Sequence, residues 1–374
     1  MKIGLVLDDT LDTPDGVQQY VLRVGSWLAA HGHDVHYLVG HTTRRDVQNV
    51  HSLSRNLRVK FNGNRMSMPL PASPRRLKAF LAQQHFDILH VQVPYSPFLA
   101  GRLLRLAPAG TKVVGTFHVL PFGRVERLAN RLLAAINRRT ARRFSGMVAA
   151  SPAAAAFAEA YYGFKTTVIP HPFSYKTFAV RAAIPTGQVT ILYLGRLVER
   201  KGALWLLKAV AELHRQKRLP ADARVVIGGK GPLLPKLQAY VHSQGLSKQV
   251  TFTGFVAEAD KPAFLAQADI GVFPSISGES FGISIIEALA AVRGVVLAGN
   301  NPGYRAAMQL DDQLVDPKDT TTFANTLAYW LHMPKERVAA AKRQRQVAQQ
   351  YDETAVCTQL LELYAKALQT RRKS

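Results

Sequence analysis

The sequence contains one cysteine, few acidic residues and no long apolar run, and each of these scarcities narrows what the chain can be. Cys357 alone excludes a disulfide framework and a metal site built from cysteines, and it fits a reducing cytoplasm. The first apolar run, Ile3–Leu7, is too short for the core of a secretory signal, and two aspartates follow it. Since an uninterrupted apolar stretch of about 18 residues occurs nowhere, we expect no transmembrane helix.

The acidic residues are outnumbered, with 25 Asp and Glu against 48 Lys and Arg, which gives a net charge of +23. An excess of this size indicates an anionic partner: nucleic acid, a membrane surface or a phosphorylated small molecule. What the chain does have is apolar material, 47% of its 374 residues, against 20% charged residues. This composition excludes a disordered or fibrous chain and suffices for two hydrophobic cores.

Short apolar runs alternate with longer amphipathic segments along the whole chain. The runs typical of buried strands are Ile3–Leu7, Val35–Val39, Ile88–Val91, Val113–Thr116, Gly146–Ala149, Thr167–Ile169, Thr190–Leu194, Arg224–Ile227, Val250–Thr253, Ile270–Phe273 and Val295–Ala298. The segments between them, such as Val17–His31, Arg75–Gln84 and Arg124–Arg143, predict helices. Buried strands alternating with helices of this length indicate an α/β fold with parallel, doubly wound sheets.

Eleven strands are too many for one ordinary sheet, so we predict two Rossmann-like domains. Pro170, Pro172 and Pro185 interrupt any regular element between the two halves. We therefore expect an N-terminal domain over residues 1–175, a C-terminal domain over residues 186–350, and a helix over residues 351–374 that packs back on the N-terminal domain. Ligands of such sheets bind at the carboxyl ends of the strands, which here would line a cleft between the domains.

The most specific motif is GESFGISIIEAL, which spans Gly278–Leu289 and follows the tenth predicted strand. We expect a helix to begin near Phe281 or Gly282, where glycine lets a ligand approach the backbone and free N–H groups bind an anion. Two glutamates, Glu279 and Glu287, stand eight residues apart, and a carboxylate accepts hydrogen bonds from the hydroxyls of a ribose or hexose. The alternative is a capped surface helix with two solvated glutamates.

Four further segments lie at or after the ends of predicted strands. GRLVERKG carries Arg196 and Lys201, two cations suited to a pyrophosphate, although a basic loop before a helix is the alternative. Gly16 begins a predicted helix and offers backbone donors there. His118 ends GTFH at the tip of a strand, where it would face the predicted cleft; a lone histidine is more often structural. IGGKGP, residues 227–232, lacks the spacing of a phosphate loop and predicts a tight turn.

Together these segments resemble one family. The E-x7-E element of Glu279 and Glu287, the G-R-x4-K-G element of Arg196 and Lys201, the N-terminal glycine turn and the strand-end histidine are similar to those of retaining glycosyltransferases of family 4, which have the GT-B fold. The resemblance spans nearly the whole chain, and GESFG is its most specific part. It implies a nucleotide-diphosphate-sugar donor, either a GDP-sugar or a UDP-sugar, and no built-in metal ion or cofactor.

The resemblance also implies a role for each matching residue. Arg196 and Lys201 would hold the diphosphate of the donor, Glu279 would contact the hydroxyls of the transferred sugar, Glu287 would contact the ribose, and His118 would lie near the sugar. Backbone groups at four positions would add to donor binding: Gly16, Phe281, Gly282 and Ile283. The implied reaction is front-face transfer with retention, in which cations stabilise the leaving diphosphate and the diphosphate takes the acceptor's proton. His118, Arg196, Lys201 and Glu279 would then be the catalytic residues.

Within the family, the N-terminal half is most similar to the bacterial phosphatidylinositol mannosyltransferases, which use GDP-mannose. The similarity rests on P-D-G-V-Q-Q (Pro14–Gln19), F-D-I-L-H (Phe86–His90), G-T-F-H and G-E-S-F-G. Two positions depart from the family pattern. Asp15 replaces a second glycine and would place a carboxylate near the diphosphate, and Pro170–Phe173 replaces the usual asparagine-glycine turn at the domain junction.

The basic residues gather in two segments of the N-terminal half. No acidic residue lies between Asp46 and Asp87, where the cations are Arg55, Arg58, Lys60, Arg65, Arg75, Arg76 and Lys78. A second segment, Arg124–Arg143, holds seven arginines and one glutamate. Each cation near an anionic leaflet contributes about 1 kcal/mol, so several together would hold an enzyme at the surface. We expect Arg65, Arg75, Arg76 and Lys78 to face a membrane; the alternative is solvated helix faces in a basic protein.

The sequence thus favours a hexosyltransferase that moves mannose from GDP-mannose to a lipid headgroup such as phosphatidylinositol, in the cytoplasm at the inner face of the cell membrane. A second hypothesis is a UDP-sugar-dependent transferase of polysaccharide or glycolipid synthesis. A third is a non-catalytic basic protein that binds membrane or nucleic acid, but such a protein would not need Glu279, Glu287 and His118. The chain also lacks the aromatic-interleaved basic strands of a single-strand binder, so we expect no nucleic-acid partner.

Overall fold

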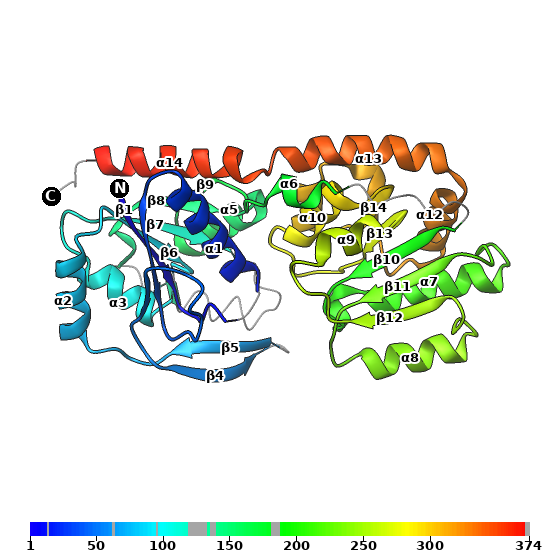
Figure 1. Ribbon diagram of the computed structural model, residues 1–374, viewed down its shortest axis with the longest axis horizontal. Coiled ribbons are helices and arrows are strands. Elements are labelled where there is room, and N and C mark those ends of the chain that lie inside the picture. Colours follow the sequence, from blue (N-terminus) through cyan, green and yellow to red (C-terminus); the bar gives the residue numbers. More distant parts are fainter. Residues whose placement is uncertain are drawn as a thin grey trace. The chain divides into compact units, whose positions relative to one another are not determined.

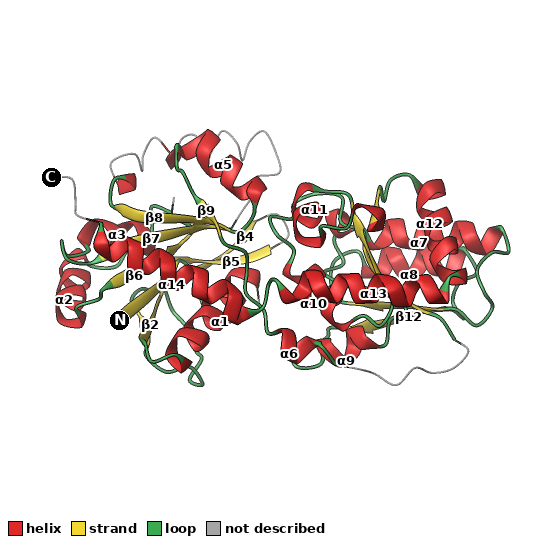
Figure 2. Cartoon of the chain, turned by 90° about the horizontal axis from the view of Figure 1, so that it is seen from above, coloured by secondary structure: helices red, strands yellow, loops and turns green. Residues whose placement is uncertain are grey.

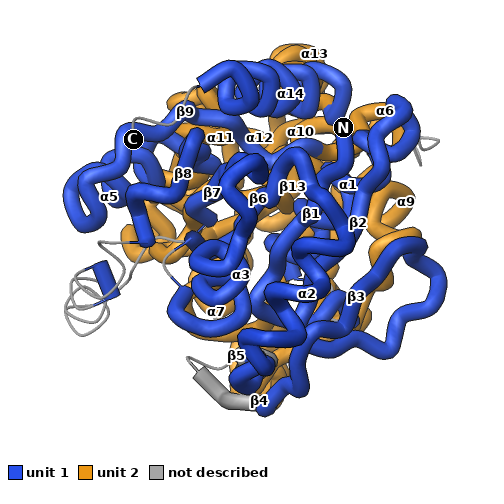
Figure 3. Tube along the Cα trace, turned by 90° about the vertical axis from the view of Figure 1, so that its left-hand side faces the viewer, with its two compact units in different colours: residues 1–172, 353–374 blue, residues 173–352 orange. Residues whose placement is uncertain are grey.

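The computed structural model describes residues 1–12, 15–61, 64–94, 96–118, 133–134, 140–180 and 188–370, and only the backbone of residues 58–61 and 64–68. The chain forms two compact units (Figure 3). Unit 1 comprises residues 1–172 and 353–374, and unit 2 comprises residues 173–352. Within the described part of the chain, no helix has both the length and the apolar character needed to cross a bilayer.

Unit 1 contains a seven-stranded parallel sheet in the order β3-β2-β1-β6-β7-β8-β9 (Figure 1). Its strands are β1 (Lys2–Leu7), β2 (Asp34–Val39), β3 (Val50–Ser52), β6 (Ile88–Gln92), β7 (Lys112–Phe117), β8 (Phe144–Ala149) and β9 (Thr167–Val168). Its helices include α1 (Gly16–Ala30), α2 (Pro74–Gln84), α3 (Leu99–Leu106), α5 (Pro152–Tyr162) and α14 (Glu353–Gln369). A separate antiparallel hairpin is formed by β4 (Asn56–Phe61) and β5 (Asn64–Pro69).

Helices cover both faces of this sheet. Successive side chains of a strand point to opposite faces, so one strand contributes to a core on each side. Ile3 and Leu5 enter one core together with residues of α1 and α14, whereas Val6 enters a second core with residues of α2 and α3. α14 packs against α1, β7 and β8, and its Tyr364 is fully buried. The C-terminal helix is therefore part of the core of unit 1.

Unit 2 contains a six-stranded parallel sheet in the order β12-β11-β10-β13-β14-β15. Its strands are β10 (Thr190–Leu194), β11 (Arg224–Gly228), β12 (Val250–Gly254), β13 (Ile270–Phe273), β14 (Val295–Gly299) and β15 (Leu314–Val315). Its helices are α6 (Tyr175–Phe178), α7 (Ala203–Arg215), α8 (Leu234–Ser243), α9 (Lys261–Ala266), α10 (Ile283–Ala291), α11 (Pro302–Met308), α12 (Thr320–His332) and α13 (Pro334–Gln349) (Figure 2).

The strand order of each sheet reverses at one point. In unit 1 the chain builds outward from β1 to β2 and β3 and then resumes on the other side of β1 with β6. In unit 2 it builds outward from β10 to β11 and β12 and resumes on the other side of β10 with β13. Ligands of open α/β sheets bind outside the carboxyl ends of the strands at such a reversal. The loops that follow β10 and β13, and those that follow β1 and β6, are therefore where a site is expected.

The predicted α/β fold with two parallel sheets is confirmed, and each of the eleven predicted strands is present. Four strands were not predicted. β3 and β15 are only three and two residues long, and the hairpin β4–β5 has basic and polar residues where a buried strand would be apolar. A helix is predicted over residues 351–374, and α14 spans Glu353–Gln369; residues 350–352 separate it from α13. The predicted helix Arg124–Arg143 lies mostly outside the described residues.

Candidate donor site

The loops at the carboxyl edge of the unit 2 sheet approach one another so closely that only glycine fits at their contacts. A Cβ on Gly202 would lie 1.9 Å from the carbonyl oxygen of Pro274, and one on Gly303 would lie 2.0 Å from that of Glu279. Real Cβ atoms do not come this close, so a side chain at either position would push the loops apart. The loop after β10, residues 195–202, is thereby held against the loop after β13, residues 274–282.

Glu279 is the point at which the charges of these loops meet. Its Oε1 accepts hydrogen bonds from Nζ of Lys201 at 2.7 Å, from Nη1 of Arg200 at 2.8 Å and from Oγ of Ser275 at 2.9 Å. The side chain is 8% exposed. Burial raises the pKa of Glu279, but the positive charges of Lys201 and Arg200 outweigh it and hold the pKa below its usual value. Glu279 is therefore a buried carboxylate that stays ionised.

Lys201 is half-buried, and burial lowers the pKa of its ammonium group. The charge of Glu279 opposes this shift, whereas the charges of Arg200 and Arg196 add to it. Arg196 lies in the same loop, half-buried, and its carbonyl oxygen accepts a hydrogen bond from the hydroxyl of Tyr193 at 3.0 Å. Two cations thus contact one carboxylate, and the charge of Arg196 also acts on Lys201, so the site carries an excess of positive charge.

The helix α10 begins beside this cluster. Gly282 is its N-cap with φ +91°, and a Cβ there would lie 2.5 Å from the ring of Tyr304. The helix starts at Ile283, one residue after the predicted Gly282, and the first N–H groups of a helix have no partner within it. Phe281 is buried with its ring 5.3 Å from that of Tyr351, so only its backbone can contribute to ligand binding. The predicted start of this helix is thus present, and the binding of a donor by its amides stays a prediction.

Glu287 lies in the second turn of α10 and is 1% exposed. Nζ of Lys261, from α9, lies 3.4 Å from its Oε2 and 2.7 Å from Oε1 of Glu258. Burial lowers the pKa of Lys261, but the two carboxylates outweigh it and raise that pKa. Lys261 was not predicted as a partner of Glu287, since nothing in its local sequence connects α9 with α10.

In unit 1, His118 is the first residue after β7 and is 3% exposed. Its Nδ1 lies 2.9 Å from Nε2 of His171, and its Nε2 lies 2.6 Å from Oε1 of Gln92 at the end of β6. Burial and the neighbouring histidines hold the pKa of His118 well below its usual value, so the ring is neutral. Neither Gln92 nor His171 was predicted, because each is a partner of His118 only through the folding of distant segments.

Gly16 is the first residue of α1. A Cβ at this position would meet nothing within 4 Å, so packing within the described residues does not require glycine there. Asp15 is the N-cap of α1, but its side chain makes no capping hydrogen bond. Tyr20, one turn further along α1, packs its ring 4.8 Å from that of His118. The first turn of α1 and the end of β7 are therefore neighbours in unit 1.

Three of the four predicted membrane residues lie on α2 of unit 1. Arg75, Arg76 and Lys78 are exposed, whereas Leu77 on the same helix is buried in the core. Arg65 lies in β5, where its side chain is outside the described residues. The helix thus presents a row of cations to solvent.

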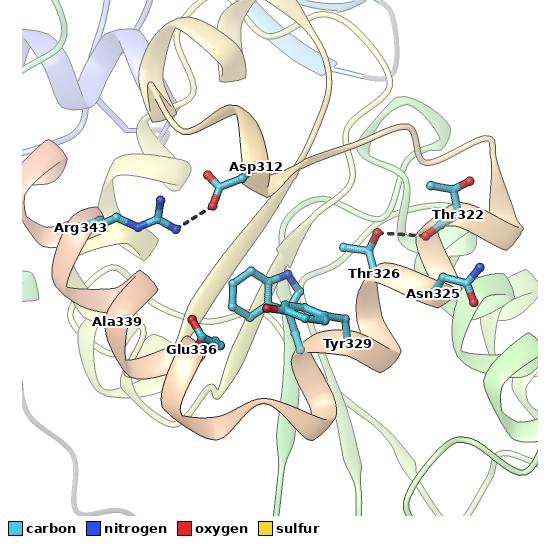
Figure 4. Close-up of a pocket in the computed structure, with 9 residues that line it drawn as sticks. Asp312, Thr322, Asn325, Thr326, Tyr329, Glu336, Ala339 and Arg343 are labelled. Atoms are coloured by element: carbon cyan, nitrogen blue, oxygen red, sulfur yellow. Dashed lines mark hydrogen bonds and ion pairs between the residues drawn. The ribbon is translucent and has the colours of Figure 1, made fainter.

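A hollow of about 680 Å³ lies between α12 and α13 of unit 2 (Figure 4). Asp312 and Arg343 at its rim form an ion pair at 2.7 Å, and Thr326 donates to the carbonyl oxygen of Thr322. Tyr329 lies between these two groups. No predicted site residue lines this hollow. The structure instead brings Arg196, Lys201, Glu279 and the start of α10 together at the edge of the sheet.

Comparison with known proteins gives the identity of both units. Residues 14–174 match the family model described as Glycosyltransferase Family 4, and residues 175–347 match the model described as Glycosyl transferases group 1. The chain belongs to the family 4, group 1 glycosyltransferases. The resemblance predicted from GESFG and GRLVERKG is confirmed.

This glycosyltransferase is 29% identical to a phosphatidyl-myo-inositol mannosyltransferase of Mycolicibacterium smegmatis over 97% of its own length and 93% of that protein. It is 28% identical to the protein of the same name from Mycobacterium leprae, over 97% and 96% of the two chains. The solved structure of sucrose-phosphate synthase from Thermosynechococcus elongatus superposes with a TM-score of 0.74 at 20% identity, covering 98% of each chain. A glycosyltransferase from Rickettsia africae superposes with a TM-score of 0.75 at 17% identity, covering 99% of each. The GT-B fold is thereby confirmed.

Proposed function

We propose that this glycosyltransferase transfers mannose from GDP-mannose, with retention, to a lipid headgroup such as phosphatidylinositol at the cytoplasmic face of the cell membrane. Similarity over nearly the whole chain to proteins named phosphatidyl-myo-inositol mannosyltransferase supports the sugar and the acceptor. A relative from Mycobacterium tuberculosis, 36% identical over 40% of each chain, is named for its dependence on GDP-mannose. This name supports the donor.

The observation that carries the proposal is the position of Lys201 beside Glu279 and the first turn of α10. In the proposed complex, the donor's diphosphate lies against Arg196 and Lys201 and accepts hydrogen bonds from the amides of Phe281, Gly282 and Ile283. Fixed positive charge at this place stabilises the negative charge that develops on the leaving diphosphate. The leaving phosphate then takes the proton of the attacking hydroxyl.

Glu279 is suited to the transferred sugar. All three of its hydrogen bonds are made by Oε1, and among the described residues none is made by Oε2. An ionised carboxylate oxygen of this kind accepts hydrogen bonds from sugar hydroxyls. Glu287 is assigned to the ribose. To accept a hydrogen bond from a ribose hydroxyl, Glu287 would give up its contact with Lys261. Gly16 and His118 of unit 1 are also assigned to donor binding, as the family resemblance implies.

The exposed cations of α2 support the proposed attachment to a membrane. Arg75, Arg76 and Lys78 are exposed, and so is the side chain of Leu70 just before the helix, at 42%. Cations beside an exposed apolar residue suit an anionic lipid surface. The peripheral location at the inner face of the membrane is proposed on this basis.

A UDP-sugar donor is the second candidate. Its support is the structural similarity to Anabaena Alr3699/HepE in complex with UDP-glucose, with a TM-score of 0.72 at 17% identity and coverage of 98% and 99%. The test is a panel of GDP- and UDP-sugars measured for thermal stabilisation of the enzyme, followed by product analysis with lipid extracts. Stabilisation by GDP-mannose and a mannosylated inositol lipid support the proposal. Stabilisation by UDP-sugars alone overturns the donor, and a water-soluble glycan product overturns the acceptor.

A further inference from the structure

His118 lies in the middle of a chain of buried hydrogen bonds in unit 1. Its Nδ1 faces Nε2 of His171 at 2.9 Å, and its Nε2 faces Oε1 of Gln92 at 2.6 Å. The ring of Tyr20 lies 4.8 Å from that of His118 and 5.0 Å from that of His171, so it packs against both. His171 is 7% exposed and stands two residues before the chain enters unit 2. It lies in the segment Pro170–Phe173, which replaces the asparagine-glycine turn that is usual in the family.

The direction of these hydrogen bonds follows from the amide of Gln92. Its Nε2 donates to the carbonyl oxygen of His90 at 3.4 Å, so its Oε1 is the atom that faces His118. An amide oxygen can only accept, and Nε2 of His118 must therefore carry the proton. Since the buried ring is neutral, Nδ1 has only a lone pair and accepts a hydrogen bond from Nε2–H of His171.

This arrangement leaves His118 one tautomer. Without a donor at Nδ1, a buried lone pair would lose its partner, and the ring would gain by moving its proton to Nδ1 or by rotating. Either change removes the N–H from the nitrogen at the Gln92 side. His171 prevents both together with Gln92, because His171 donates to Nδ1 and Oε1 of Gln92 accepts from Nε2–H.

We propose that His171 is a positioning residue that holds His118 in the tautomer protonated at Nε2, so that His118 presents a hydrogen-bond donor rather than an acceptor on the side of Gln92. The proposal rests on the proposed function for one step only, namely that a hydroxyl of the transferred sugar takes the place of Gln92 at this N–H. The new element is His171, which keeps the proton of His118 on Nε2 and so makes His118 a donor. A sugar hydroxyl then accepts this hydrogen bond through its oxygen.

The test uses the full-length enzyme labelled with ¹⁵N-histidine, together with His171→Phe, which removes the donor, and His171→Gln, which places an amide donor near the same point. The ¹⁵N shifts of His118, identified by their loss in His118→Asn, report its tautomer. We expect the wild type and His171→Gln to show Nε2–H and His171→Phe to show Nδ1–H or a mixture. In transfer assays we expect His171→Phe to lower kcat by about 10- to 100-fold, as for groups that orient metal-bound histidines, with His171→Gln recovering most of it.

The outcomes separate this proposal from the proposed function. Wild-type His118 protonated at Nδ1, or an unchanged tautomer in His171→Phe, overturns the positioning role, and the wild-type spectrum alone decides if His171→Phe does not fold. A loss of kcat that His171→Gln does not recover also contradicts it. Absence of mannosyl transfer by an enzyme that shows the expected tautomers overturns the proposed function and leaves the role of His171 standing.

Discussion

Nζ of Lys201 lies 2.7 Å from Oε1 of Glu279, and this contact joins the loop that follows β10 to the loop that follows β13. The two loops leave the sheet of unit 2 at the point where its strand order reverses. Glu279 is buried and Lys201 is half-buried, and the start of α10 lies beside them. A cation, a carboxylate and a set of helix amides are thus gathered at the edge where α/β sheets bind their ligands.

Removing either proposed diphosphate cation should reduce turnover more than it reduces stability. We expect Arg196→Ala or Lys201→Ala to lower kcat by about 10²- to 10³-fold, the effect of losing one group that stabilises developing negative charge. Glu279 would keep Arg200 and Ser275 as partners in Lys201→Ala, so the fold should persist. Steady-state kinetics and thermal unfolding check this, with the exposed Lys236→Ala as the matched control. Rates near that of the wild type in both variants would remove the cations from the mechanism.

Gly16 offers a test that separates ligand binding from folding. A Cβ at this position meets no described atom within 4 Å, so we expect Gly16→Ala to change the free energy of unfolding by less than about 1 kcal/mol. If the backbone at Gly16 approaches the donor, the added methyl group should raise the KM for the nucleotide sugar. Gly282→Ala is the contrasting variant, because its Cβ would lie 2.5 Å from the ring of Tyr304 at a left-handed φ, and it should lower the melting temperature. An unchanged KM in Gly16→Ala would exclude a donor contact there.

The exposed cations of α2 should contribute to membrane binding. We expect Arg75, Arg76 and Lys78 changed together to Gln to weaken binding to phosphatidylglycerol-containing vesicles by about 100-fold, at about 1 kcal/mol for each cation. Vesicle flotation measures this, and the same loss should appear in wild type at high salt. The control changes three exposed lysines of unit 2, Lys236, Lys248 and Lys318. Equal flotation of both triple variants would exclude α2 as the membrane face.

The buried histidines of unit 1 should make the fold sensitive to acid. Burial lowers the pKa of His171 from 6.5 to about 4 and that of His90 to about 3, and it lowers the pKa of His118 as well. Between pH 6.5 and about 4 the unfolded chain therefore binds protons that the folded chain does not, so stability falls as the pH falls. Asp8 acts in the opposite sense between pH 3.8 and about 6, because burial raises its pKa to about 6. The three histidines together lower the stability on acidification by more than Asp8 raises it.

Denaturant unfolding at pH 7.5, 6 and 5 measures this dependence. His171 alone should account for about 2 kcal/mol of the loss at pH 5. His171→Gln removes one titrating group, so the loss between pH 7.5 and 5 should be smaller in this variant by about that amount. A stability that does not change over this range, or one that rises on acidification, would show that the histidines are not buried as described.

The parts of the fold and site that could be predicted from sequence are those with a local pattern. Buried parallel strands are continuous apolar runs, so β1, β10 and β13 were recognisable. Arg196, Lys201 and Glu279 could be found because they lie in the loops that follow such strands. The hairpin β4–β5 has no apolar run to reveal it.

The residues that set the charge and protonation of these groups could not be predicted. Lys261 reaches Glu287 from another helix, and His171 reaches His118 across 53 residues of sequence. Contacts of this kind depend on the register of packed elements, and no spacing within one segment encodes them. The sequence therefore identified the groups proposed to bind the donor, whereas the structure supplied the residues that set their charge and tautomer.

The most direct test of the central claim is the binding of GDP and GMP, measured by calorimetry with wild type and with the double variant Arg196→Ala and Lys201→Ala. If the edge of unit 2 binds a diphosphate, GDP should bind wild type at least about 100-fold more tightly than GMP, and this difference should disappear in the double variant. UDP and UMP give the same comparison should the donor be a UDP-sugar. The account is contradicted if GDP binds wild type no more tightly than GMP does, or if GDP still binds more tightly than GMP in the double variant.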